Sequence, residues 1–144
     1  MNQLDAEQFF HLHGYRSTPQ RHFILKALEQ EQTHLTIEQL LECVREYCPQ
    51  MTLSTIYRTL DLFLRLGMVR VTHVSGQQPY YERVRGPAHH HLLCRRCHSL
   101  SHLDETLLGD LHERLEKESS FHDLTLELLV TGYCETCWDN DHWR

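Results

Sequence analysis

The chain of 144 residues lacks an apolar run long enough to cross a membrane as a helix. Its first residues, MNQLDAEQFF, lack the basic and then apolar layout of a secretory signal. These two absences predict a cytoplasmic protein with no membrane partner. Low-complexity segments and internal repeats are also absent, apart from two CxxC motifs, and the 40% of apolar residues is enough for one standard domain or two small ones.

An excess of basic charge is missing as well. Residues 1–86 hold nine Lys and Arg against nine Asp and Glu, whereas residues 87–144 hold five against eleven, which accounts for the net charge of −6. The acidity therefore belongs to the second half, and a polyanion such as DNA would have to approach the first half.

Cysteine and histidine are the residues that the chain has in unusual number, with six and thirteen copies. Without a secretory signal, paired cysteines more often bind metal or do redox chemistry than form structural disulfides. Each CxxC motif stands at the end of a predicted strand, and the motifs consist of Cys94 and Cys97, and Cys134 and Cys137. A structural zinc ion needs four thiolates at ~2.3 Å, which two such motifs supply. The sequence therefore predicts a structural Zn²⁺ site.

The alternative interpretation is a thiol-disulfide redox protein that uses the CxxC pairs. A redox CxxC is expected near a βαβ pattern, which the sequence does not suggest around either pair, and zinc is favoured for that reason. Cys43 and Cys48 have no partner at a suitable spacing, so we expect a core residue and a helix-end thiol.

Capping residues mark the helices of the first half. Thr18 and Pro19 have the order of an N-cap and a first helical residue. Thr36 and Gln39 have the spacing of a capping box, and apolar residues follow at helical intervals. These signals predict helices that begin near residues 19 and 37.

A further helix and a hairpin complete the first half. Residues 53–66 place apolar side chains, Leu53 among them, on one face and polar side chains on the other, and Gly67 ends the pattern. Residues 68–84 alternate around a Ser75-Gly76 turn, as in a β-hairpin. Besides an N-terminal helix at residues 4–13, three helices followed by a hairpin are the order of a winged helix-turn-helix.

Gly86 and Pro87 are the predicted hinge between two domains, residues 1–86 and 87–144. The second half combines strands with one helix. Its expected elements are a strand at 89–94, a strand at 99–103, a helix at 105–118 and a strand at 124–134. The predicted class is therefore α+β, an N-terminal winged helix-turn-helix followed by a small α/β domain.

The run of histidines before Cys94 divides between two faces of its strand. Residues two apart on a strand point the same way, so His89 and His91 share one face, and His90 shares the other with Cys94. His89 and His91 are then free to hold a second metal, although an HxH pattern also occurs in metallohydrolases and at plain surfaces. Further candidate ligands are Glu82, His34 and His102.

Six segments are GYRSTPQR, HLTIEQL, LSTIYRTLDLFLRLGMV, YYERV, HHHLLCRRC and GYCETC. In their order and spacing, the chain resembles the ferric uptake regulator family of bacterial metal-sensing repressors. The resemblance covers residues 14–137. It implies a homodimer that binds double-stranded operator DNA through its winged helix domain. It also implies that residues 87–144 form a zinc-containing dimerisation domain and that a regulatory metal lies at the hinge. The family's regulatory ligands fall on His34, Glu82, His89 and His91, and a carboxylate ligand of some members falls on His102.

The helix at residues 53–66 is the expected DNA-recognition element. Tyr57 could pack on a thymine methyl group, while Ser54, Thr55 and Arg58 could reach phosphates or bases. By the resemblance, Tyr57 and Arg58 contact DNA and Arg16 reaches a neighbouring minor groove; Arg21 is a further candidate. The alternative is an ordinary amphipathic helix with a solvated polar face.

The regulatory ligand set is rich in nitrogen and suits Fe²⁺ or Zn²⁺, and Mn²⁺ or Ni²⁺ as well. A zinc hydrolase would need an open metal position and a general base, which the sequence does not supply, so neither an enzyme nor a small-molecule substrate is expected. Relatives that hold a further metal in the second domain use histidines where this chain has Ala88 and Leu126, so we expect that site to be lost and His90 to be a surface residue. His98 stands where the family usually has glycine.

Overall fold

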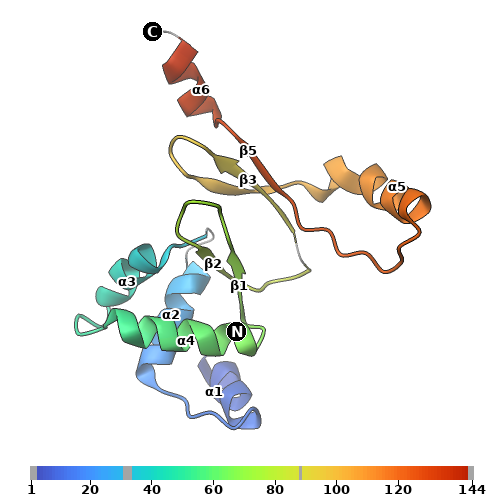
Figure 1. Cartoon of the computed structure of the whole chain (residues 1–144). Helices are drawn as coiled ribbons and strands as arrows, with labels where there is room; N and C mark the ends of the chain where they lie inside the picture. Colours follow the sequence, from blue (N-terminus) through green and yellow to red (C-terminus); the bar gives the residue numbers. More distant parts are fainter. Residues whose placement is uncertain (1–2, 31–33, 88, 143–144) are drawn as a thin grey trace. The chain divides into compact units, whose positions relative to one another are not determined.

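The computed structural model describes residues 3–30, 34–87 and 89–142. The chain divides into two compact units, Met1–Arg85 and Gly86–Arg144 (Figure 1). Both helices and strands are present, which confirms the α+β class. None of the helices within the described ranges combines the length and apolarity needed to cross a membrane.

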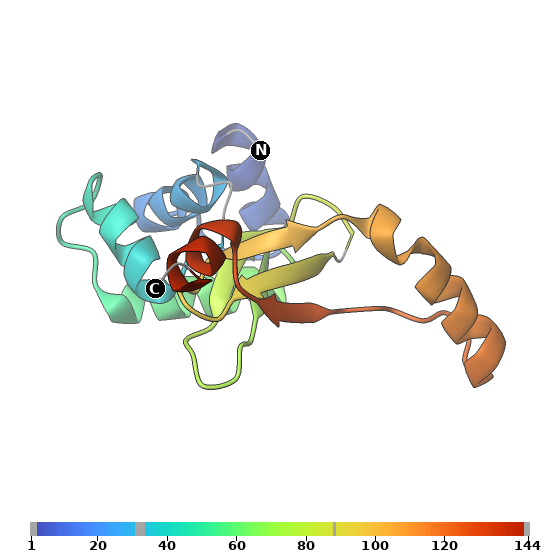
Figure 2. The same cartoon turned by 90° about the horizontal axis from the view of Figure 1, so that it is seen from above.

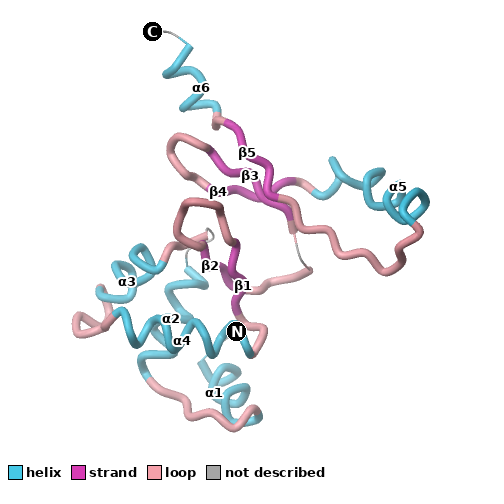
Figure 3. The backbone as a smooth tube through the Cα atoms, viewed as in Figure 1, coloured by secondary structure: helices cyan, strands magenta, loops and turns pink. Residues whose placement is uncertain are grey.

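The first unit consists of four helices followed by an antiparallel hairpin (Figure 3). Its elements are α1 (Gln3–Leu12), α2 (Pro19–Gln30), α3 (Ile37–Arg45), α4 (Leu53–Arg65), β1 (Val69–Thr72) and β2 (Tyr80–Arg83). This is the element order that the sequence predicted for a winged helix. An isolated β-bridge between Leu35 and Tyr81 joins the start of α3 to β2.

Local signals explain where these helices begin and end. Thr36 accepts a hydrogen bond from the Gln39 amide and the Gln39 side chain accepts one from the Thr36 amide, so the predicted capping box is present. Thr52 caps α4 by accepting a hydrogen bond from the Thr55 amide. Gly67 follows α4 with φ of +67°, a conformation that glycine adopts without strain.

The core of the first unit is built from the apolar faces of all four helices. Phe10 and Phe63 stack with ring centroids 5.9 Å apart, and neither side chain is exposed to solvent. Ile56 and Leu60 of α4 are buried as predicted, whereas Leu53 is 43% exposed and the prediction for it is wrong. Leu53 lies in the first turn of α4, at the edge of the core.

The second unit is a three-stranded sheet with helices outside it. Its elements are β3 (His90–Cys94), β4 (Leu100–Leu103), the 3₁₀ turn η1 (Glu105–Leu108), α5 (Gly109–Ser119), β5 (Leu129–Gly132) and α6 (Glu135–His142). The strand order is β4-β3-β5, with β4 antiparallel and β5 parallel to β3. Figure 2 shows that α5 lies beyond the end of the strands rather than over a face of the sheet, and none of its side chains is buried.

Two predictions for this unit are corrected. The expected helix at 105–118 is divided at Gly109 into a 3₁₀ turn and an α-helix. The expected strand at 124–134 is only four residues long. The register that pairs His91 with Leu129 would place Pro87 opposite Thr125, and proline has no N–H to donate, so the pairing cannot extend to residue 124.

The parallel pairing of β3 and β5, with α5 in the connection, also corrects the view that no βαβ arrangement surrounds the CxxC pairs. Parallel strands point the same way, so Cys94 at the end of β3 and Cys134 just after β5 lie at the same end of the sheet. This pairing therefore brings the two CxxC motifs together.

Candidate metal centres and nucleic-acid face

The four cysteines of the two CxxC motifs form one cluster in the second unit. Their Sγ atoms all lie within 4.8 Å of one another, and those of Cys97 and Cys134 are 3.8 Å apart. Four sulfurs at ~2.3 Å around a tetrahedral zinc ion would be about 3.8 Å apart. The donor set and its spacing therefore fit Zn²⁺, and none of the four cysteines forms a disulfide.

The protonation of these thiols also favours a cation. Backbone N–H groups, that of Cys134 first, lower the pKa of Cys94 to about 5. The neighbouring sulfurs, that of Cys134 first, and burial raise the pKa of Cys137 to about 12. Four thiols at this distance cannot all ionise without a positive charge among them, and Zn²⁺ supplies that charge.

Two of the predicted regulatory ligands meet within the first unit. His34 Nε2 lies 3.1 Å from Glu82 Oε2, and both residues are 7% exposed. His34 precedes α3 and Glu82 lies on β2, and the bridge between their neighbours Leu35 and Tyr81 holds the two backbones side by side. A buried imidazole beside a buried carboxylate is a donor pair suited to a divalent transition metal.

The other three predicted ligands meet within the second unit. The ring centroids of His89 and His91 are 4.8 Å apart, and that of His102 lies 4.1 Å from the first and 5.6 Å from the second. His91 and His102 are direct cross-strand partners on β3 and β4. The alternation along β3 that the sequence predicted therefore holds, and three imidazoles converge on one face of the sheet.

His90 corrects another prediction, because it is buried rather than at the surface. Its Nδ1 accepts a hydrogen bond of 3.2 Å from the Leu128 amide. It lines a cavity of about 460 Å³ together with His112 and Leu126. Within the described ranges no group of three metal-binding side chains forms around His90, and Ala88 lies outside those ranges.

The polar face of α4 is open to solvent. Ser54 and Arg58 are exposed, Tyr57 is 55% exposed, and Thr55, whose amide donates to the Thr52 hydroxyl at the N-cap, is half-buried. The face thus presents hydroxyl, phenol and guanidinium groups, which is the chemistry that DNA phosphates and base edges accept.

The two arginines before and within α2 differ. Arg16 is exposed, whereas the half-buried Arg21 donates to the Arg16 carbonyl and lies 5.8 Å from the Phe10 ring centroid and 5.9 Å from that of Tyr15. Arg21 therefore braces the loop that carries Arg16, a role that its sequence position did not reveal.

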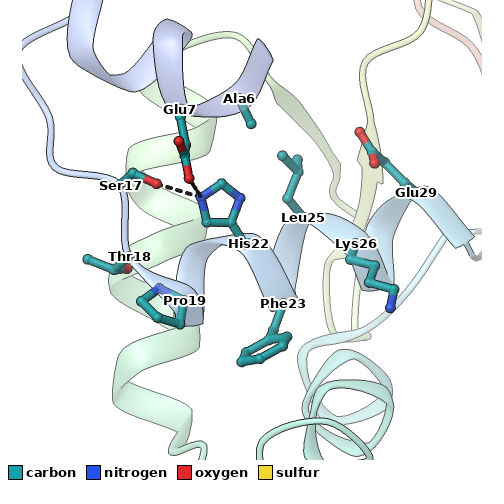
Figure 4. Close-up of a pocket in the computed structure, with 10 residues that line it drawn as sticks. All are labelled: Ala6, Glu7, Ser17, Thr18, Pro19, His22, Phe23, Leu25, Lys26 and Glu29. Atoms are coloured by element: carbon teal, nitrogen blue, oxygen red, sulfur yellow. Dashed lines mark hydrogen bonds and ion pairs between the residues drawn. The ribbon is translucent and has the colours of Figure 1, made fainter. Parts of the chain in front are cut away.

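A cavity of about 580 Å³ in the first unit holds none of the predicted site residues (Figure 4). His22 points between Ser17 and Glu7, with its Nε2 2.5 Å from the serine Oγ and 4.0 Å from a carboxylate oxygen. One lysine and two glutamates give the lining no dominant charge. Its residues are Ala6, Glu7, Ser17, Thr18, Pro19, His22, Phe23, Leu25, Lys26 and Glu29.

Comparison with known sequences decides the family. The sequence model of the ferric uptake regulator family matches residues 12–131. The chain belongs to the ferric uptake regulator family. It is 34% identical over 141 residues to the ferric uptake regulation protein of Bacillus subtilis, an alignment that covers 94% of this chain and 95% of that one.

Solved structures of ferric uptake regulator proteins share the fold. The Helicobacter pylori ferric uptake regulator superposes with a TM-score of 0.85 at 18% identity, over 94% of this chain and 90% of that one. A zinc-bound manganese uptake regulator superposes with a TM-score of 0.75 at 26% identity, over 89% and 97%. The family member described here thus has the fold that its sequence motifs implied.

Proposed function

We propose that this ferric uptake regulator family member is a metal-responsive repressor that binds operator DNA as a homodimer. The buried pair of His34 and Glu82 carries the proposal, because it lies apart from the four cysteines, which already supply a complete ligand set for structural zinc, and offers nitrogen and oxygen donors for a second ion. The resemblance of the motifs, and relatives whose names describe ferric uptake regulation, support the same function.

The sensed ion is proposed to bind His34 and Glu82 of the first unit together with His89, His91 and His102 of the second. Four imidazoles and one carboxylate suit Fe²⁺ or Zn²⁺, and Mn²⁺ or Ni²⁺ fit the same donor types. The ion would supply a link between the two units. The structural ion is a separate Zn²⁺ held by the four cysteines, whose thiolates are the softer donors.

Each sensor residue has a defined task in this scheme. Glu82 offers an anionic oxygen that offsets the ion's charge, and the imidazoles donate neutral nitrogen lone pairs. Ligands drawn from both units can favour DNA binding only if the linked arrangement binds the metal better than the unlinked one. Couplings of this kind amount to about 1–3 kcal/mol, or roughly five- to 150-fold in DNA affinity.

DNA binding is assigned to the polar face of α4. Tyr57 and Arg58 are proposed to contact bases and backbone, with Ser54 and Thr55 at the helix N-terminus beside a phosphate, and Arg16 reaching the adjacent minor groove. Residues 1–86 carry no net charge, so a single copy offers a weak electrostatic footprint. Two copies double the phosphate contacts, which is a physical reason for a dimer.

The second unit has the surface that a second copy requires. β5 is an edge strand with Leu129 and Val130 37% and 43% exposed, and α5 leaves Leu111 exposed. An unpaired edge with apolar side chains is a template for pairing with another chain. We propose that these surfaces form the homodimer interface.

The experiment that tests the function is metal-dependent binding to the protein's own promoter DNA. Zinc-loaded protein is titrated with Fe²⁺ under anaerobic conditions, and with Zn²⁺, Mn²⁺ and Ni²⁺, while DNA binding is followed by fluorescence anisotropy. His89→Ala should keep one zinc per chain and the fold but lose the metal response, whereas His122→Ala, at an exposed histidine outside the cluster, should keep it. Loss of the zinc in His89→Ala would refute the separation of the two sites.

The redox alternative has one supporting observation, the low pKa of Cys94, which is also typical of reactive thiols. A thiol-disulfide oxidoreductase would lose titratable thiols reversibly under mild oxidant. A thiol count of the zinc-loaded protein that stays unchanged under mild oxidant would exclude that function.

A further inference from the structure

Two segments of the first unit run side by side from the proposed sensor ligands towards the loop of the β1–β2 hairpin. His34 contacts Glu82 at one end, with 3.1 Å between Nε2 and Oε2. Next to them, the Leu35 amide donates to the Tyr81 carbonyl at 2.9 Å and the Tyr81 amide donates to the Leu35 carbonyl at 2.8 Å. These are the two hydrogen bonds of an antiparallel β-bridge.

The contact continues beyond the bridge. Gln78, in the hairpin loop just before β2, donates from Nε2 to the Glu38 carboxylate at 3.0 Å. The three contacting pairs have an antiparallel order, because residues further along 34–38 meet residues further back along 78–82. We call this set of contacts the α3–hairpin seam, and it comprises the pairs His34–Glu82, Leu35–Tyr81 and Glu38–Gln78.

The seam joins elements that matter for DNA binding. Glu38 lies in the first turn of α3, whose start is fixed by its capping box. Tyr81 is 8% exposed and belongs to the same core cluster as Ile56 and Leu60 of α4. The middle of the seam therefore belongs to the same core that α4 lines.

We propose that the α3–hairpin seam transmits metal binding at His34 and Glu82 to the β1–β2 hairpin, with Glu38 and Gln78 as positioning residues for DNA binding. This inference rests on the proposed function. A metal held by His34 and Glu82 keeps the first pair of the seam together. The adjacent pairs then open less often, because an antiparallel pair separates from its ends, and the hairpin spends more time in one position against α3.

The proposed role of the Glu38–Gln78 contact and an ordinary surface hydrogen bond predict different effects on DNA binding. If the contact is only a surface hydrogen bond, breaking it changes the DNA affinity by the same factor with and without metal. If it is the last pair of the seam, breaking it lowers the ratio of DNA affinities between the metal-bound and metal-free states. That ratio is the quantity to measure, because it cancels any direct effect of a changed charge on DNA.

The experiment compares Gln78→Glu, Glu38→Gln and the double variant Glu38→Gln/Gln78→Glu in the full-length, zinc-loaded protein. Gln78→Glu places two carboxylates together and should open the end of the seam. The double variant restores an amide-to-carboxylate hydrogen bond with the roles exchanged and keeps the net charge of the wild type. DNA affinity is measured on duplex DNA from the protein's own promoter, with and without the ion among Fe²⁺, Zn²⁺, Mn²⁺ and Ni²⁺ that gives the largest response in the wild type.

Couplings of this kind span roughly five- to 150-fold, and Gln78→Glu should lower the ratio of DNA affinities with and without metal at least about threefold. The double variant should restore the ratio of the wild type. Hydrogen exchange of the Leu35 and Tyr81 amides, measured without DNA, should slow when the same ion is added to the wild type. The proposed role of the seam would be overturned by an unchanged affinity ratio in Gln78→Glu, or by a double variant whose ratio is as low as that of the single variant. A wild type whose DNA binding responds to none of Fe²⁺, Zn²⁺, Mn²⁺ and Ni²⁺ would instead overturn the proposed function itself.

Discussion

Removal of the four-cysteine zinc should unfold the second unit and leave the first unit folded. Within residues 89–142, the buried hydrophobic side chains are Leu93, Cys94 and Cys137, and two of these three are thiols of the cluster. The first unit, in contrast, has a continuous core drawn from all four of its helices and from β1 and β2. The second unit therefore has almost no apolar core apart from the metal cluster.

The magnitudes decide between the two sources of stability. Full burial of one leucine contributes about 1.5–3 kcal/mol, which is all that Leu93 can supply. A structural zinc ion in a small domain contributes roughly 10–16 kcal/mol of apparent binding free energy at neutral pH. The second unit should therefore fold only with its zinc, even if pairing with a second copy along β5 adds to its stability.

The variant Cys94→Ser tests this reasoning, with Cys43→Ser, a half-buried thiol of the first unit, as control. Both tryptophans, Trp138 and Trp143, lie in residues 87–144, so tryptophan emission reports on the second unit, while far-UV circular dichroism is dominated by the helices of the first. At all temperatures, Cys94→Ser should show emission red-shifted from that of the wild type, in which Trp138 is 50% exposed, and it should retain the helical thermal transition of the first unit. Native emission in the zinc-free variant, with an emission-detected Tm equal to that of the wild type, would refute the reasoning.

Four further outcomes are expected. His98 has φ of +59°, a conformation that glycine adopts with less strain, so His98→Gly should stabilise the second unit by about 0.5–1 kcal/mol in chemical denaturation. The control His122→Gly should not stabilise it, because His122 has no positive φ. Thr36→Ala should cost the first unit about 1 kcal/mol through its lost cap, and an unchanged urea midpoint would contradict this. Arg58→Ala should weaken DNA binding and reduce the salt dependence by about one phosphate contact per protomer, while Arg65→Ala, paired with Asp61 at the end of α4, should do neither. Metal-dependent DNA binding should weaken as the pH falls, because protons compete with the metal for the imidazole nitrogens, and a flat response from pH 8 to 5.5 would argue against histidine ligation.

The first unit could be predicted closely because its helix signals are local. Thr36 and Gln39 contact each other across one turn, and Gly67 adopts its positive φ without help from any distant residue. The burial of Ile56 follows from helical spacing, which needs only the apolar period. The role of Arg21 could not be predicted, because its contacts with Phe10 and Tyr15 depend on how α1 packs.

The second unit was harder because its strands depend on partners distant in sequence. Residues 124–128 have the alternation of a strand, but apart from the Leu128 carbonyl, which accepts a hydrogen bond from the His91 amide, they pair with none of the described strands. Side chains occupy their backbone groups instead, since the Leu128 amide donates to His90 and the His112 ring contacts the Leu124 carbonyl at 3.0 Å. Neither contact can be deduced from periodicity, so the burial of His90 could not be predicted either.

Strand parity and strand direction together explain how one short segment serves two proposed ions. Parity places His89 and His91 on one face of their strand, which the sequence could predict, and the register of β3 with β4 brings His102 to that face. Direction is a tertiary property: the parallel register that pairs Cys94 with Gly132 places Cys134 two residues beyond the end of β5, beside the first CxxC motif. An antiparallel β5 would put Cys134 at the opposite end of β3, beside the histidines, and the four-cysteine cluster could not form. The direction of β5 is therefore what keeps the thiolates and the imidazoles in separate sites.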